Sequence, residues 1–355
     1  MGGLAVARVD ERDAREGAHV SDAERLRVAL DLDGSLESLG NSMDDLADAL
    51  VATGSCDLVR FRSTQAMHEG DVRLRGRWRH EPAWRRGRGR AIDTLLPRVN
   101  LVHVAGVATP PTRLVPLVIS VDDLRPLRGE VRTHQRLAQL RRAISRGATL
   151  VASSRSASHE VLDVLGVERH QVVVVPPAVP SVSPTLDGDD LVVNVTGALE
   201  RLVQVAPALV ELAKRLESRV VVLASADAAA ALRAASTTMT IRPRHDAREA
   251  LSRARAVVHL SDGARFPSFA IAALAAGVPT VARSTAINRE LLGSAAVLVE
   301  SHDEVVSALE EIATRESRRA ILIAAGRSRA TDFAPATAAR AYLDLYRDVV
   351  QGWTS

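Results

Sequence analysis

Short apolar runs separated by amphipathic segments predict that this chain folds as parallel α/β structure. In the first half, the runs that we expect to form buried strands lie at residues 27–32, 58–61, 100–104, 117–121, 150–153 and 172–175. The helices predicted between them lie at 43–52, 133–146 and 160–165. Alternating strands and helices favour a parallel sheet with right-handed crossovers and helices on both faces.

A second αβ series follows a proline-rich linker. The linker contains Pro176, Pro177, Pro180, Pro184 and Gly188. Prolines at this density hinder both helix and sheet, so we expect a domain boundary here. Beyond the linker, we expect strands at 191–195, 220–223, 256–261 and 280–282, and helices at 207–216, 304–313 and 336–350.

These elements divide the chain into four parts. Residues 1–24 lack a core pattern, and we expect them to be disordered. Residues 25–180 and 181–335 are each expected to form a Rossmann-like domain, and residues 336–355 a last helix. A chain of 355 residues is long for one hydrophobic core and sufficient for two.

Composition narrows the class of protein further. Hydrophobic residues make up 46% of the chain but aromatic residues only 3%, which predicts cores packed from small side chains. The net charge is only +3, and Lys214 is the only lysine, so the basic character reflects arginine usage rather than a nucleic-acid partner. The single cysteine excludes an intramolecular disulfide and a cysteine metal cage. Without a long apolar run or an apolar signal core, we expect a cytoplasmic protein.

The stretch from Asp262 to Glu300 gives the clearest local signal. A predicted strand runs into a turn and then a short helix, which Pro267 suits at its first turn and Gly277 at its end. The start of such a helix, at the carboxyl end of a parallel strand, offers unpaired N–H groups and a positive dipole end. The stretch therefore predicts either a diphosphate site or an ordinary αβ unit of a core.

This stretch resembles the donor-binding segment of family-four retaining glycosyltransferases. The family pattern is P-S-x-x-E-G-F-G-x-x-x-x-E-A-M-A-x-G-x-P-V-V-A, then a loop with a Glu, then G-x-A-x-L-V. The chain keeps Ser261, Phe266, Ala273, Ala275, Gly277, Pro279, Val281, Ala282, Glu290, Gly293, Ala295 and Leu298. The resemblance spans about residues 27–350 and implies the GT-B fold: two Rossmann-like domains across a cleft, with the last helix returning to the first domain.

The two acids of the family pattern are absent from this chain. The first falls on Ala264 and the second on Ala272, and a methyl group accepts no hydrogen bond from a sugar or ribose hydroxyl. Each such charged hydrogen bond contributes roughly 1.5–3 kcal/mol. Asp262 could supply a displaced carboxylate, and Arg265 could instead hold a phosphate.

The resemblance also implies a donor site on the second domain. Residues 197–201 resemble the family phosphate loop G-x-L-x-x-R-K-N with one residue missing. Arg201 matches the family Arg, whereas the family Lys falls on Leu202, so one of two cations is kept. The donor-binding residues that we predict are Gly197, Arg201, Arg265, Phe266, Ser268 and Glu290.

On the acceptor side, we predict His103, Asp122 and Asp123, which lie at or near the ends of two first-domain strands. Where the family has T-V-H-D-L, this chain has S-V-D-D-L, so Asp123 matches the family Asp. Capping of a loop is the alternative role for Asp123, and packing in the core is favoured for His103. Asp123 and Asp262 are the candidate catalytic groups.

An arginine-rich segment at 73–90 surrounds Trp78 and Trp84. Arginine with interfacial tryptophan fits an anionic membrane surface, and a solvated basic loop is the alternative. Nucleic-acid phosphates would attract the same charges, but no nucleic acid is expected. If the membrane interpretation holds, the protein lies at the inner face of the membrane.

Two functions remain open on the sequence. One is a glycosyltransferase that moves a sugar from a nucleotide-diphosphate donor to a glycan or polyprenyl-linked acceptor, with retention. The other is a catalytically degenerate GT-B protein that serves as partner or scaffold of an active enzyme. No histidine pair has metal spacing, and neither a G-x-G-x-x-G strand turn nor a Walker loop occurs, so we expect no metal and no cofactor.

Overall fold

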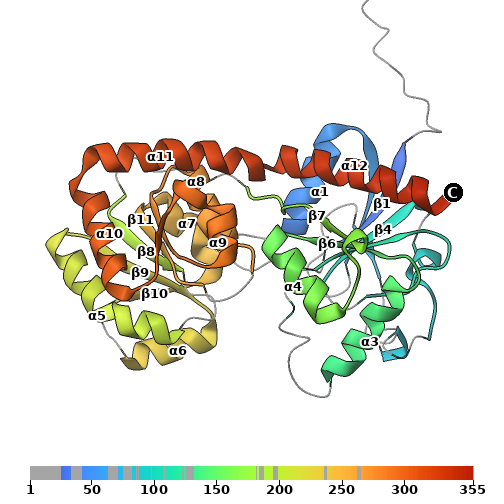
Figure 1. Ribbon diagram of the computed structural model, residues 1–355, viewed down its shortest axis with the longest axis horizontal. Coiled ribbons are helices and arrows are strands. Elements are labelled where there is room, and N and C mark those ends of the chain that lie inside the picture. Colours follow the sequence, from blue (N-terminus) through green and yellow to red (C-terminus); the bar gives the residue numbers. More distant parts are fainter. Residues whose placement is uncertain are drawn as a thin grey trace, which may run out of the picture.

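The computed structural model describes most of the chain as two α/β units joined by a linker and two long helices (Figure 1). The residues that it describes are 25–32, 42–62, 71–74, 82–84, 86, 88–96, 98–106, 109–121, 124, 132–180, 182–183, 188–194, 199–235, 238–261 and 265–354. The sequence-based prediction for residues 1–24 lies outside this set.

The first sheet is parallel throughout, with strand order β3-β2-β1-β4-β5-β6-β7. Its strands are β1 (Leu26–Asp31), β2 (Cys56–Arg62), β3 (Val72–Arg73), β4 (Leu101–Ala105), β5 (Leu117–Ser120), β6 (Thr149–Ala152) and β7 (Val172–Val174). Among the described residues, the α-helices of this unit are α1 (Ser42–Thr53), α3 (Arg132–Ile144) and α4 (Arg155–Leu165). The near-continuous apolar strands are those of a sheet buried on both faces.

The second sheet is also parallel, with order β10-β9-β8-β11-β12-β13. Its strands are β8 (Asp190–Asn194), β9 (Arg219–Ala224), β10 (Thr240–Pro243), β11 (Ala254–His259), β12 (Thr280–Arg283) and β13 (Val297–Val299). The helices around it are α5 (Leu199–Arg215), α6 (Ala226–Ala235), α7 (Ala247–Ser252), α8 (Ser268–Ala275), α9 (Ala286–Leu291) and α10 (His302–Thr314). Two separate sheets confirm the predicted two-domain Rossmann-like organisation.

Two long helices cross between the units. In Figure 1, α11 (Glu316–Ala330) lies over the second unit, and α12 (Pro335–Thr354) continues over the first. The inner face of α12 is buried against α1 and the first sheet, in one cluster with Leu30, Leu46 and Tyr346. The predicted return of the last helix to the first domain is confirmed.

A buried polar cluster fastens α12 to the first sheet. His103 is fully buried in β4; its Nδ1 lies 2.6 Å from the Tyr346 hydroxyl and its Nε2 lies 2.8 Å from the Ser120 hydroxyl. The Tyr342 hydroxyl lies 3.3 Å from the same Ser120 oxygen. Burial lowers the pKa of His103 to about 3, so the ring is neutral. This placement in the core departs from the acceptor-side role predicted for His103, because neither ring nitrogen faces open space.

The structure corrects two predicted helix starts. Helix α4 begins at Arg155 rather than at residue 160, because the Ser154 hydroxyl accepts a hydrogen bond from the Ala157 amide and caps the first turn. Helix α5 begins at Leu199 rather than at residue 207, and Pro207 lies inside it with its ring exposed. Both shifts matter for the site, because they place Ser156 and Arg201 in the first turns of helices.

Candidate functional site

The carboxyl ends of the two sheets face one another across the interdomain space. From the second unit, Glu290 on α9 reaches the first turn of α4, which follows β6. The positive charge of Arg248 on α7 also acts on Asp45 of α1, which follows β1. A cavity of about 390 Å³ lies between the units and is lined by Ser154 from the first and Arg329 from the second. In open α/β sheets, ligands bind at the carboxyl ends of strands, so these facing edges form the candidate site.

The Glu290 carboxylate is fully engaged by the first unit. Its Oε1 accepts a hydrogen bond from the Arg155 amide at 2.7 Å. Its Oε2 accepts from the Ser156 amide at 2.8 Å and from the Ser156 hydroxyl at 2.7 Å. Burial alone would raise the pKa of Glu290, but these hydrogen bonds and the Arg155 charge together lower it below its usual value. The carboxylate predicted to contact a donor is thus placed as an interdomain contact instead.

Asp45 is the second acid at this boundary. Burial raises its pKa to about 6, the charges of Asp44 and Asp48 add to the rise, and Arg248 opposes it. Its neighbour Asp44 pairs with Arg62, a fully buried arginine whose Nε also donates to Asp71 at 2.8 Å. These pairs hold the carboxyl end of β2 against the start of α1.

On the α5 side of the second sheet, two arginines lie at the carboxyl edge. Arg201 is in the first turn of α5, directly after β8, and Arg283 is the last residue of β12. Strand residues alternate between faces; because Val281 belongs to the core cluster under α5, Arg283 projects toward the α5 side as well. Burial lowers the pKa of Arg283, and the charge of Arg201 adds to this effect, as expected of two nearby guanidinium groups. Two cations at one strand edge can accept a diphosphate.

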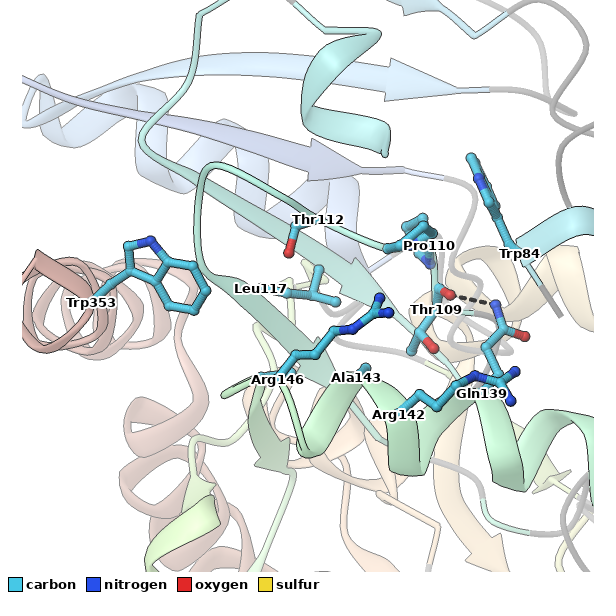
Figure 2. Close-up of a pocket in the computed structure, with 12 residues that line it drawn as sticks. Trp84, Thr109, Pro110, Thr112, Leu117, Gln139, Arg142, Ala143, Arg146 and Trp353 are labelled. Atoms are coloured by element: carbon cyan, nitrogen blue, oxygen red, sulfur yellow. Dashed lines mark hydrogen bonds between the residues drawn. The ribbon is translucent and has the colours of Figure 1, made fainter. Parts of the chain in front are cut away.

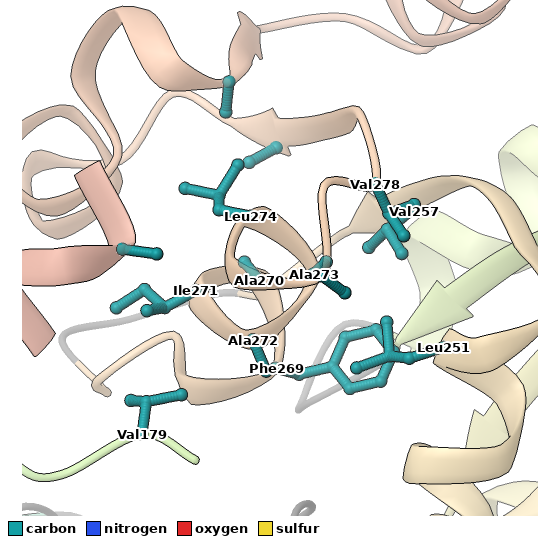
Figure 3. Packing of buried hydrophobic residues seen from close by; sticks show 14 of the residues in the cluster. Val179, Leu251, Val257, Phe269, Ala270, Ile271, Ala272, Ala273, Leu274 and Val278 are labelled. Atoms are coloured by element: carbon teal, nitrogen blue, oxygen red, sulfur yellow. The ribbon is translucent and has the colours of Figure 1, made fainter. Parts of the chain in front are cut away.

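On the α8 side of the same sheet, the site positions are apolar. Ala272, where the family pattern has its second Glu, is fully buried in one cluster with Phe269, Leu251 and Val179 (Figure 3). Phe266 is also nearly buried, and its ring packs edge-on against Phe333 at 5.8 Å. Phe266 therefore serves packing in this structure rather than facing open space as a donor contact would.

Two buried polar residues lie side by side at the carboxyl edge of the second sheet, on neighbouring strands. Asn194 ends β8 and His259 ends β11, and the two are register partners. Asn194 Nδ2 lies 3.5 Å from His259 Nδ1, while Asn194 Oδ1 has no hydrogen-bond partner among the residues that the structure describes. Burial lowers the pKa of His259 to about 4, so this histidine is neutral at neutral pH.

The remaining predicted donor contacts, Arg265 and Ser268, both lie at the start of α8 and are partly exposed. The N-cap position is Pro267, whose side chain makes no capping hydrogen bond. Gly197, Asp122, Asp123, Asp262 and the alanine at 264 fall outside the described residues, so the candidate catalytic carboxylates remain predictions.

A small cavity of about 30 Å³ lies away from this edge, under α3 and near Leu117 at the start of β5 (Figure 2). Gln139 Nε2 donates to the Thr109 carbonyl, while Gln139 Oε1 and Thr109 Oγ1 have no partner within the described part of the chain. The volume and the unpaired polar atoms fit buried water rather than a substrate.

Trp84 lines the same cavity and lies within the arginine-rich segment. It is only 3% exposed, and its indole N–H donates to the Arg90 carbonyl at 2.9 Å. The prediction of an interfacial tryptophan is therefore wrong for Trp84, because its ring is part of the first-unit core. Trp78 and much of the segment at 73–90 lie outside the described residues.

The described part of the chain contains neither a cluster of metal-ligating side chains nor a membrane-spanning helix. Within those residues, no three His, Cys, Asp or Glu side chains gather as metal ligands would. Within the same residues, no helix has the length and apolar content needed to span a bilayer.

Comparison with solved structures identifies the architecture. Sucrose-phosphate synthase from Thermosynechococcus elongatus aligns over 92% of this chain and 100% of its own, with a TM-score of 0.64 and 13% identity. Anabaena HepE, solved in complex with UDP and glucose, aligns over 91% of this chain and 100% of its own (TM-score 0.68, 12% identity). WaaG, a glycosyltransferase involved in lipopolysaccharide biosynthesis, aligns over 88% of this chain and 98% of its own (TM-score 0.64, 14% identity).

No protein-family model and no curated protein sequence matches the chain. At identities of 12–14%, the structural likeness establishes the fold and not the reaction. The chain has the two-domain GT-B fold, as the resemblance in its second half implied.

Sequence reasoning missed three features of this region. Arg283 had a usable signal, since it is a charged residue directly after the buried run 280–282 that predicted β12. The pairing of Glu290 with Ser156 left no signal in the sequence, because the two residues are 134 positions apart. The pairing of His103 with Tyr346 likewise depends on where α12 returns.

Proposed function

We propose that the protein is a glycosyltransferase that moves a sugar from a nucleotide-diphosphate donor to a glycan or polyprenyl-linked acceptor, with retention. The observation that carries the proposal is the pair of arginines, Arg201 and Arg283, at the carboxyl edge of the second sheet in a GT-B fold. The solved neighbours support it, since one of them was crystallised with UDP and glucose.

The proposed role of the arginine pair is to hold the diphosphate and to stabilise it as it leaves. Negative charge develops on the leaving oxygen when the bond to the sugar breaks, and fixed cations stabilise that charge. Guanidinium groups bind phosphate oxygens in bidentate fashion, and the start of α8 adds a helix dipole at the same edge. Arg283 on this account replaces the family Lys that falls on Leu202.

The acceptor is proposed to enter from the first unit, whose carboxyl edge lies opposite. Asp123 and Asp262 are the proposed acids of the site, and neither belongs to the described residues. Contact of the arginine-rich segment with an anionic membrane is a proposal about the lipid-linked acceptor. It rests on charge alone, because Trp84 is buried.

The test of the proposed function is a turnover assay with a panel of nucleotide sugars. The purified protein is incubated with each donor, and release of the nucleoside diphosphate is measured for the unmodified chain and for Arg201→Ala. We expect release with at least one donor and a loss of about ten-fold or more in the variant. If no donor turns over but UDP still binds, the chain is a non-catalytic GT-B protein, and the proposal of catalysis fails.

A further inference from the structure

We infer that Glu290 is a positioning residue that docks the second domain onto the first turn of α4 and thereby sets the separation of the two carboxyl edges. The contact joins residues 134 and 135 positions apart, across the interdomain space. It joins protein groups alone and is argued without the proposed diphosphate site, so it stands apart from the proposed function.

The geometry at α4 is that of an occupied helix N-terminus. The first N–H groups of a helix have no intrahelical acceptor and need an outside partner. In α4, the first intrahelical bond runs from the Ser158 amide to the Ser154 carbonyl. The Ala157 amide donates to the Ser154 hydroxyl, within the first domain. The amides of Arg155 and Ser156 both donate to Glu290, in the second domain.

The segment that carries Glu290 is braced at its start. Thr285 caps α9 by accepting from the Asn288 amide at 3.2 Å. The Asn288 side chain donates to the Arg283 carbonyl at 2.8 Å, and Arg289 donates to the Ser284 carbonyl and hydroxyl. These bonds make one unit of the stretch from Arg283 to Glu290.

The same segment is braced at its end. Arg329 donates to the Glu290 and Leu291 carbonyls at 2.9 and 2.8 Å, and its guanidinium lies 5.1 Å from the Phe333 ring centre. The Phe333 carbonyl in turn accepts from the Val179 amide in the interdomain linker, at 2.9 Å. A carboxylate on so rigid a support fixes where the first domain sits relative to Arg283.

Hydrogen exchange of single amides tests the contact directly, on the full chain without ligand. In Glu290→Gln, we expect exchange at the Arg155 and Ser156 amides to rise about ten-fold or more, the change that a loss of about 1.4 kcal/mol produces. The Ala157 amide should keep its protection, because its acceptor is in its own domain. Glu310→Gln is the matched control, since Glu310 pairs with Arg215 at 2.8 Å within the second domain.

Two further measurements separate positioning from donor binding. Small-angle scattering should give a larger radius of gyration for Glu290→Gln than for Glu310→Gln. UDP affinity should stay within about two-fold of the unmodified chain, because the proposed diphosphate contacts lie within the second domain. Ser156→Ala removes only the hydroxyl donor. Exchange at the amides of residues 155 and 156 should therefore rise by less than in Glu290→Gln.

Unchanged protection at both amides, or an unchanged radius of gyration, would overturn the inference. A ten-fold loss of UDP affinity in Glu290→Gln would also overturn it, and would return Glu290 to the donor site. If the unmodified chain binds no UDP, the proposed function fails, while the exchange and scattering results still decide the role of Glu290.

Discussion

The two sides of the second sheet's carboxyl edge differ in chemistry although one set of strands supports both. On the α5 side lie two partly exposed cations, Arg201 and Arg283. On the α8 side, Ala272 is enclosed by apolar side chains. The α5 side therefore carries the charges of the proposed diphosphate site, whereas Ala272 on the α8 side contributes to the core. Ala272 stands where the family pattern has its second Glu and is fully buried, so the sugar contacts of the proposed donor site must come from other residues.

The largest expected effect comes from restoring the missing acid on the α8 side. Ala272→Glu would bury an unpaired carboxylate among apolar groups, which costs about 3–5 kcal/mol of unfolding free energy. Chemical denaturation measures the loss, and Ala208→Glu on the exposed face of α5 is the control, expected to change little. A stable Ala272→Glu protein that gains nucleotide-sugar turnover would contradict this division, because position 272 would then face the donor.

A smaller effect is expected at the end of α8. Gly277 has φ +74°, and an added Cβ would lie 2.7 Å from Arg327 Nε on α11. Gly277→Ala should therefore cost about 2 kcal/mol, from left-handed backbone strain plus displacement of Arg327. Gly54 has φ +63° and open space around it. Gly54→Ala therefore measures the cost of the left-handed backbone strain alone. Equal losses in the two variants would show that Arg327 moves at no cost.

Acidification should lower the stability of the fold through His259, the last residue of β11. Burial lowers the pKa of His259 to about 4, so between pH 6.5 and 4 the unfolded chain binds a proton that the folded chain does not. Stability should fall as pH falls, by up to about 1.4 kcal/mol per pH unit from this residue. His103 acts in the same direction, and Asp45, with its pKa raised to about 6, acts against both.

His259→Gln should flatten that pH dependence, as measured by thermal unfolding at several pH values. His134→Gln, which removes an exposed imidazole from α3, is the matched control. An unaltered slope in His259→Gln would contradict this account, because it would mean that His259 has the same pKa in the folded and the unfolded chain.

Much of the fold was predictable from sequence because its strands are buried on both faces. Continuous apolar runs such as 220–223 mark such strands without tertiary information, and the proline-rich linker separates the two series. Helix starts were less predictable where a proline suggested a boundary: Pro207 is accommodated inside α5. The start of α4 depended on the cap from Ser154, which is a local signal that the predicted boundary overlooked.

The site was predictable only where chemistry is local. Arg201 lies in the first turn of the helix that follows a strand, and the structure brings it near Arg283. The roles of Glu290 and His103 depend instead on partners more than a hundred residues away in sequence. Periodicity and motif spacing carry no information about such contacts, so the donor-side assignment of Glu290 came from the family pattern alone.

Calorimetric titration with UDP tests the central claim, that the arginine pair on the α5 side is a diphosphate site. Arg201→Ala and Arg283→Ala should each weaken UDP binding by about 1.5–3 kcal/mol, the size of a charge-assisted hydrogen bond. The double variant should lose less than the sum, because both groups hold one diphosphate. Arg233→Ala on the exposed face of α6 is the control. Unchanged UDP affinity in both single variants would contradict the account.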